Sequence, residues 1–140
     1  MEDVIGGKNE TIIREFIKAW SRLDPEELSQ YFTEDGIYHN LPSGPVKGRG
    51  KIKKFISDFV IDWKETEWDI ITIMSKGDTV MVERLDRTKA KGKKVNLPCT
   101  GIFILEDGKI KEWRDYFDLL TYMKGIGVGS LIKTGIRQRK

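Results

Sequence analysis

The stretch Val80–Arg87, with the sequence VMVERLDR, and the stretch Lys111–Asp118, with the sequence KEWRDYFD, place charged residues where a folded chain needs apolar ones. Read as β-strands, both send alternate side chains to opposite faces. Arg84 and Asp86 then lie on the apolar face of the first strand, and Asp115 lies between two aromatic residues on one face of the second. The two stretches therefore predict strands whose inner faces carry two carboxylates and a guanidinium.

Charged groups on an inner face are costly unless they pair with one another. Arg84, Asp86 and Asp115 can satisfy each other's charges, and a buried cluster of this kind is a candidate for acid–base chemistry. The strand pattern by itself fits a second interpretation equally well, in which the cluster only braces the fold.

A third predicted strand favours the catalytic interpretation. The stretch Gly36–Leu41, with the sequence GIYHNL, puts Tyr38 and Asn40 two residues apart on one face. A phenol and an amide side by side can hold a water molecule through hydrogen bonds without ionising themselves.

The order of the remaining elements predicts the fold class. Helical periodicity and capping residues predict three helices in the first half of the chain: Asn9–Leu23, a short helix that begins at Pro25 after the cap Asp24, and a helix that carries Ile52, Phe55, Ile56 and Phe59. A turn is predicted at Thr33–Gly36 and a loop at Leu41–Pro45.

Strands follow in the second half, separated by glycine-containing turns: Trp68–Met74, Val80–Lys89, Val95–Leu105 and Lys109–Phe117. Asp118 can cap a last short helical turn. Helices followed by consecutive hairpins indicate an α+β fold, in which a curved, mixed but mostly antiparallel sheet wraps around the N-terminal helices and encloses a pocket.

Three motifs together resemble one family, the limonene-1,2-epoxide hydrolases. They are Tyr38-x-Asn40, Glu83-Arg84-x-Asp86 and the run Trp113–Leu119, with the sequence WRDYFDL. The order and spacing of the elements between the motifs match as well, from about the first helix to Leu119, whereas the stretch after Gly125 is not covered. The resemblance implies a cone-shaped fold of the nuclear transport factor 2-like and SnoaL-like superfamily, which also contains ketosteroid isomerase.

The resemblance also implies a role for each polar residue of the motifs. Asp115 would be the general base that takes a proton from water, and Asp86 the general acid that protonates the epoxide oxygen. Arg84 would bridge and orient both aspartates, and Tyr38 and Asn40 would position the water. Water would attack a small apolar epoxide directly, without a covalent enzyme intermediate, a cofactor or a metal, and the protein would be a homodimer.

Two other classes of function stay open on the sequence. An isomerase or cyclase of the same fold, like ketosteroid isomerase, would use a carboxylate base beside a carbonyl and would have no need of a positioned water. A non-catalytic binding or dimerisation module would leave the charged cluster as a solvated salt bridge.

Length and charge indicate one folded domain with a separate tail. The chain has 140 residues, and we expect a single domain over residues 1–126 and a basic, mobile tail over residues 127–140. The tail holds four basic residues and no acid, so a net charge of +3 for the chain leaves −1 for the domain. A nearly neutral body does not present the basic face that nucleic-acid binding needs.

The remaining features exclude further classes of protein. No apolar run is long enough to span a membrane, and the start of the chain does not resemble a signal peptide, so we expect a cytoplasmic protein without a membrane partner. The single cysteine, Cys99, is expected to fill space in the core. The single histidine, His39, alternates away from Tyr38 and Asn40 and is expected to be structural or exposed.

Overall fold

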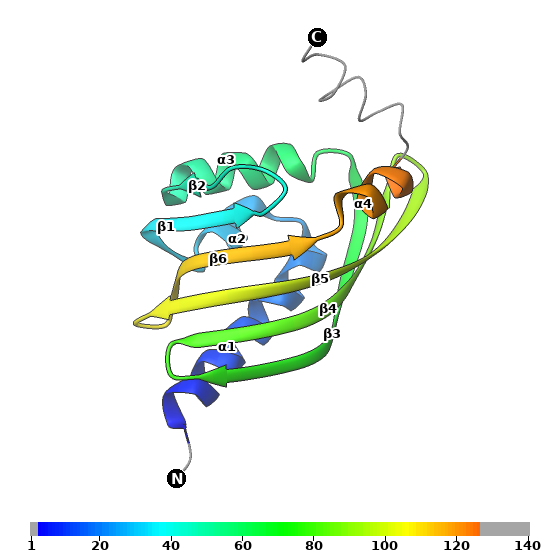
Figure 1. Ribbon diagram of the computed structural model, residues 1–140. Coiled ribbons are helices and arrows are strands. Elements are labelled where there is room, and N and C mark those ends of the chain that lie inside the picture. Colours follow the sequence, from blue (N-terminus) through cyan, green and yellow to red (C-terminus); the bar gives the residue numbers. More distant parts are fainter. Residues whose placement is uncertain (1–2, 127–140) are drawn as a thin grey trace.

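The computed structural model describes residues 3–126 of the protein. In this range the helices are α1 (Val4–Ala19), α2 (Pro25–Ser29), α3 (Arg49–Phe59) and α4 (Leu119–Ile126), with a short 3-10 helix, η1 (Trp20–Arg22), between α1 and α2. The strands are β1 (Phe32–Asn40), β2 (Val46–Lys47), β3 (Trp63–Lys76), β4 (Thr79–Ala90), β5 (Lys93–Glu106) and β6 (Lys109–Phe117), as Figure 1 shows. The predicted tail, residues 127–140, lies outside the described residues.

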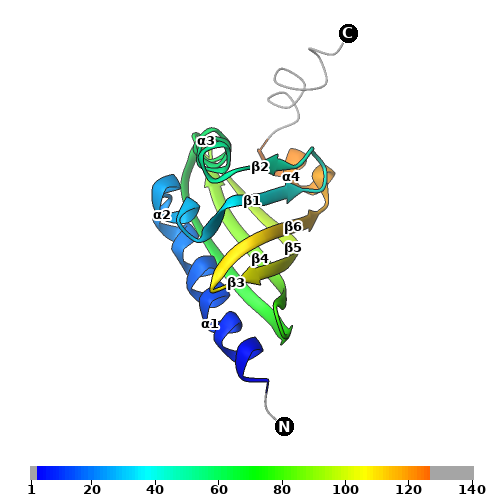
Figure 2. The same cartoon turned by 90° about the vertical axis from the view of Figure 1, so that its left-hand side faces the viewer.

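All strands join one curved sheet in the order β2-β1-β6-β5-β4-β3. Strands β1 and β6 pair in parallel, and every other pairing in the sheet is antiparallel. Helices α1, α2 and α3 lie on one side of the sheet (Figure 2), where α1 packs against β3 and β4 and α3 packs against β1. The α+β class and the mixed, mostly antiparallel sheet wrapped around N-terminal helices are thus confirmed.

Helix α1 begins earlier than its apolar pattern predicts. Buried residues recur at helical spacing from Ile13 to Ala19 and anchor the helix to the sheet. The helix nevertheless begins at Val4 instead of Asn9, because Asp3 supplies an N-cap: its Oδ1 accepts a hydrogen bond of 2.9 Å from the Gly6 amide. The predicted start was therefore wrong by five residues.

The predicted turn at Thr33–Gly36 was also wrong, since these residues belong to β1. The pairing of β1 with β6 shifts register between Phe32 and Ile37: five steps along β1 match two steps along β6. The sequence signals of a turn mark a bulge, which re-aims the strand without ending it. Beyond the bulge, β1 runs beside β6 up to Asn40.

The alternation predicted for β4 is confirmed in full. The residues from Val80 to Ala90 at even positions are buried, including Arg84 and Asp86, while Met81, Glu83 and Arg87 are exposed. Apolar and aromatic side chains from α1 and the inner face of the sheet fill the core around them. The inner face is therefore where the charged cluster meets the core.

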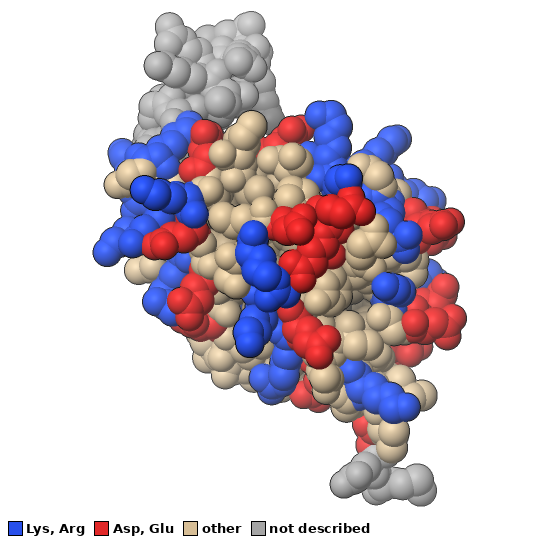
Figure 3. All heavy atoms as spheres, turned by 180° about the vertical axis from the view of Figure 1, so that it is seen from behind, with Lys and Arg blue, Asp and Glu red and all other residues tan. Residues whose placement is uncertain are grey.

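The outer surface is mixed in charge. Seen from the back of Figure 1, Lys and Arg side chains are interspersed with Asp and Glu (Figure 3). Within residues 3–126, no helix has the length and apolar character needed to cross a membrane.

Candidate active site

Arg84 binds two carboxylates at once through its guanidinium. Its Nε and Nη2 donate to Oδ1 and Oδ2 of Asp86 at 2.8 and 3.0 Å. Its Nη1 and Nη2 donate to Oδ1 and Oδ2 of Asp115 at 2.7 and 2.6 Å. Both contacts are bidentate, which is the strongest geometry available to an arginine and a carboxylate. The predicted cluster of the three residues is therefore present as a closed network.

The network lies in the interior of the protein. The relative exposure of Arg84 is 0%, that of Asp86 is 6% and that of Asp115 is 3%. Aromatic rings flank the guanidinium: its Cζ lies 4.3 Å from the ring centroid of Trp68 and 5.7 Å from that of Trp113. Burial opposes the charge on Arg84, but the two carboxylates outweigh it and hold the pKa of Arg84 above its usual range.

Arg84 and Asp115 are joined across a strand that lies between theirs. Arg84 is on β4 and Asp115 is on β6, with β5 between them. Gly101 of β5 pairs with Asp115, and a Cβ added there would lie 3.0 Å from Arg84 Nη1 and 2.9 Å from Trp113 Nε1. The guanidinium thus crosses β5 over a position that has room for no side chain.

The surroundings of Asp86 favour its protonated form. Burial raises the pKa of Asp86 to about 6, with Arg84 acting in the opposite direction and the charge of Asp115 adding to the rise. Asp86 can therefore hold a proton in a pH range where an ordinary aspartate is ionised. This is the property that a carboxylic general acid needs.

Tyr38 and Asn40 come beside Asp115 through the parallel pairing of β1 and β6. Tyr38 pairs with Trp113 and Asn40 pairs with Asp115. Both polar side chains are buried, and no group within residues 3–126 gives Asn40 Oδ1 a hydrogen bond. Burial, reinforced by the charge of Asp115, raises the pKa of Tyr38 well above its usual range, so the phenol stays neutral. Burying an amide oxygen without a hydrogen bond costs free energy, and a polar molecule in the cavity would supply the missing hydrogen bond.

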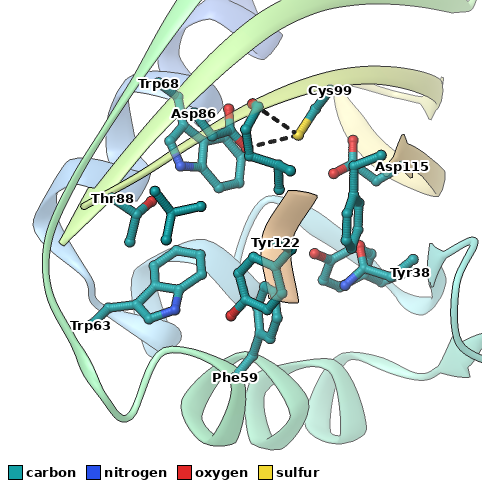
Figure 4. Close-up of a pocket in the computed structure, with 13 residues that line it drawn as sticks. Tyr38, Phe59, Trp63, Trp68, Asp86, Thr88, Cys99, Asp115 and Tyr122 are labelled. Atoms are coloured by element: carbon teal, nitrogen blue, oxygen red, sulfur yellow. Dashed lines mark hydrogen bonds between the residues drawn. The ribbon is translucent and has the colours of Figure 1, made fainter. Parts of the chain in front are cut away.

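These side chains border a cavity on the inner face of the sheet (Figure 4). The lining residues come from β1, α3, β3, β4, β5, β6 and α4: Tyr38, Asn40, Phe59, Trp63, Trp68, Asp86, Thr88, Val95, Leu97, Cys99, Asp115, Phe117 and Tyr122. Asp86, Asp115 and Asn40 supply polar groups to the wall, and most of the remaining wall is apolar or aromatic.

The structure agrees with the expectations for Cys99 and His39. Cys99 is buried with Val95 and Leu97 in a small hydrophobic cluster, and it also lines the cavity with its Sγ 3.4 Å from Asp86 Oδ2. The hairpin register seen in the structure pairs Cys99 with Arg84, which brings the thiol to the charged cluster. His39 faces away from the cavity side chains, and its Nε2 lies 3.0 Å from the Ser43 carbonyl oxygen. This agrees with a structural role.

Other lining residues could not be assigned from the sequence. Tyr122 comes from α4 and Thr88 from the far part of β4, and neither belongs to a motif. Trp68 is held by a hydrogen bond of 2.9 Å from its Nε1 to Thr66 Oγ1, which in turn lies 2.7 Å from Thr88 Oγ1. In the described part of the chain, no three His, Cys, Asp or Glu side chains are grouped so that they could hold a metal ion.

Comparison with known proteins places this geometry in a family. A family model described as the limonene-1,2-epoxide hydrolase catalytic domain matches residues 7–127. Epoxide hydrolase EphG of Mycobacterium tuberculosis is 26% identical over 114 residues, which are 81% of this chain and 76% of EphG.

Solved structures share the fold. An LEH-like epoxide hydrolase of M. tuberculosis superposes with a TM-score of 0.76 at 24% identity, over 91% of this chain and 95% of that one. A candidate SnoaL-like polyketide cyclase from Jannaschia sp. CCS1 superposes with a TM-score of 0.80 at 20% identity, over 90% of this chain and 96% of that one. Likeness at this level of identity bears on the fold, and the family follows from the sequence match over residues 7–127. The chain belongs to the limonene-1,2-epoxide hydrolase family.

Proposed function

We propose that this protein hydrolyses an apolar epoxide to a vicinal diol by a one-step attack of water, without a cofactor or a covalent intermediate. One observation carries the proposal. The closed network of Asp86, Arg84 and Asp115 borders the same cavity as the unpaired Oδ1 of Asn40. An acid, a base and a holder for water therefore border one largely apolar cavity.

Asp115 acts as the base and Asp86 as the acid. As the oxygen of water bonds to a ring carbon, Asp115 takes one proton from that water. The bond between that same carbon and the ring oxygen breaks on the side opposite the water, and the ring oxygen, which stays on the neighbouring carbon, takes the proton of Asp86. The raised pKa of Asp86, about 6, supports this division, since the acid must hold a proton before the reaction. Arg84 stays bound to both carboxylates while the negative charge moves from one to the other.

Tyr38 and Asn40 hold the attacking water beside Asp115. The neutral phenol can donate a hydrogen bond to the water, and Asn40 Oδ1 can accept one from it. Asn40 pairs with Asp115 on the neighbouring strand, so the amide and the base are adjacent on the same face. An isomerase that moves a proton beside a carbonyl has no use for a water held in this place.

The cavity wall supports an apolar substrate. Apart from its polar groups it is built from apolar and aromatic side chains such as Phe59, Trp63, Leu97 and Phe117. Such a wall stabilises hydrocarbon by removing it from water, and it offers little that could pair with a charged group.

A single turnover in ¹⁸O-labelled water, with enzyme in excess over epoxide, tests the one-step mechanism. Direct attack places one ¹⁸O in the diol and leaves the protein unlabelled by mass spectrometry. If an aspartate attacked first, the new oxygen of the diol would come from the carboxylate, and the label would appear in the enzyme. Unlabelled diol from the first turnover would overturn the mechanism, and absence of diol from a panel of apolar epoxides would overturn the proposed activity.

A further inference from the structure

Cys99 lies against Asp86, the acid of the proposed reaction. The proposed mechanism gives Asp86 a role but gives none to Cys99. Its Sγ is 3.4 Å from Asp86 Oδ2 and 3.5 Å from the Leu97 carbonyl oxygen. Cys99 is buried on β5, where it pairs with Arg84, and it lines the cavity together with Asp86 (Figure 4). The thiol therefore forms part of the cavity wall and also contacts Asp86, the proposed acid.

The thiol has one proton and two acceptors within reach. Burial raises the pKa of Cys99 far above its usual range, so the group stays a neutral S–H donor. It can donate to Asp86 Oδ2 or to the Leu97 carbonyl, but not to both fully. Which acceptor it chooses depends on Asp86, because an ionised oxygen is a much better acceptor than a protonated carboxyl group.

We infer that Cys99 is a positioning residue for the acid, whose S–H turns from the Leu97 carbonyl to Asp86 Oδ2 as Asp86 gives up its proton. This inference rests on the proposed function. The S–H bond itself does not break. While Asp86 is protonated, the thiol donates its hydrogen bond to the Leu97 carbonyl oxygen, and Oδ2 accepts from Arg84 alone and can carry the proton. As the proton leaves for the epoxide oxygen, the thiol turns and stabilises the carboxylate that forms.

The other polar neighbours of Asp86 cannot perform this task. Arg84 donates to both oxygens of Asp86 and is committed at the same time to Asp115. Tyr38 and Asp115 act on Asp86 through space, and the adjacent strand β3 contributes the uncharged Trp68. Cys99 is thus the donor beside Asp86 that has an alternative partner, and its hydrogen bond lowers the pKa of Asp86.

Titration of Asp86 itself tests the inference without any turnover. Protein labelled with [4-¹³C]aspartate gives a carboxyl resonance for Asp86, which is assigned by its absence from Asp86→Asn. Cys99→Ala removes the donor, and the pKa of Asp86 should rise by up to about one unit, the size of one hydrogen bond. Cys99→Ser keeps a donor and should leave the pKa at or below the wild-type value.

Leu97→Ala is the matched control for lost packing. Leu97 pairs with Asp86 and lines the same wall, and its side chain donates nothing. A cavity that admits water would stabilise the ionised carboxylate and lower the pKa of Asp86, which is the opposite of losing the thiol. The direction of the shift therefore separates a positioning role from a merely structural one.

The kinetic signature is a split between kcat and KM. In Cys99→Ala the alkaline fall of kcat/KM should move to higher pH by the same amount as the NMR titration, and kcat should fall by up to about tenfold with a smaller change in KM. An Asp86 pKa in Cys99→Ala equal to that of the wild type would overturn the inference. A Cys99→Ser protein that titrates like Cys99→Ala would do the same. Failure of the proposed function shows itself elsewhere, as absence of diol, and leaves the NMR result standing.

Discussion

The indole of Trp113 lies face to face with the phenol ring of Tyr38, with ring centroids 4.2 Å apart and planes within 3° of each other. The same indole lies 5.7 Å from the guanidinium of Arg84. Trp113 belongs to the apolar core and is fully buried, so it cannot shift without moving its neighbours. Trp113 therefore orients Tyr38, which is proposed to hold the water. It also flanks the Arg84 guanidinium, which binds both aspartates.

Loss of a single contact to the water should slow the reaction without stopping it. In Tyr38→Phe the stacked ring stays and only the hydroxyl is lost, and in Asn40→Ala the unpaired amide oxygen is lost. Each change should lower kcat by about tenfold or somewhat more, the value of one hydrogen bond to the reacting group. Steady-state kinetics with unchanged thermal stability would check this. A rise in kcat on every epoxide tested would contradict the role given to these side chains.

Replacement of either aspartate should remove almost all activity. Asp86→Asn cannot deliver a proton as an acid of suitable strength, and Asp115→Asn cannot accept one from water. Each change should lower kcat by at least about 10²–10⁴-fold, which is typical of one acid–base role. Circular dichroism and the melting temperature show whether the variants fold. A folded Asp115→Asn protein with nearly wild-type kcat would end the proposed mechanism.

The rate should fall at alkaline pH because the acid loses its proton. With the pKa of Asp86 raised to about 6, kcat/KM of the free enzyme should begin to fall near this pH and decline about tenfold per unit above it. An apolar substrate excludes more water from Asp86, so the fall of kcat should lie at higher pH than the fall of kcat/KM. Profiles of both constants between pH 4 and 9 are the measurement.

The same shift in pKa has a signature in folding. Asp86 has a higher pKa in the folded protein than its ordinary value of 3.8, so the folded state binds the proton more tightly. Its contribution to stability is present below about pH 4 and is lost as the pH rises through about 6. Asp86→Asn should remove this part of the pH dependence of the melting temperature. A profile unchanged by the substitution would show that Asp86 titrates normally.

A methyl group at Gly101 should displace the guanidinium. In Gly101→Ala the new Cβ would lie 3.0 Å from Arg84 Nη1, with Trp113 closing the other side. Overpacking of this kind costs about 1–3 kcal/mol of stability, and misplacing the acid and base by an ångström can cost about 10²-fold in rate. Gly50→Ala is the control, because nothing lies near Gly50 on α3. The control should be neutral or slightly stabilised, and a Gly101→Ala protein that matched it would contradict the crossing described here.

The outer face of the sheet is expected to join two copies of the chain. Met74 and Met81 pair across β3 and β4 and are 56% and 40% exposed, and Met81 also pairs with Ile102 on β5. An apolar stripe of this kind favours association. Sedimentation at micromolar concentration should give a dimer mass, and Met81→Asp should lower it. Ile61→Asp, at an exposed residue outside the strands, should leave the mass unchanged. A monomeric wild type would rule out the dimer.

Local pattern alone was enough for the inward side chains of β4 and β6, although it missed the start of β1, the first five residues of β3 and the whole of β2. Period-two alternation placed Arg84 and Asp86 inside on β4, and Asp115 inside on β6, because the direction of a side chain in a strand depends only on its own backbone. Helical spacing and the cap at Asp24 likewise predicted the helices. The α+β class followed from the order of these elements, which is also a property of the chain as written.

Only the tertiary structure decided which of these side chains are in contact and which residue lies between them. Arg84 reaches Asp115 because β5 lies between β4 and β6 and has Gly101 at the crossing. Cys99 stands beside Asp86 because of the register of one hairpin. The bulge in β1 looked like a turn, since the same residue types serve both. These facts depend on pairing between distant segments, which a local pattern cannot contain.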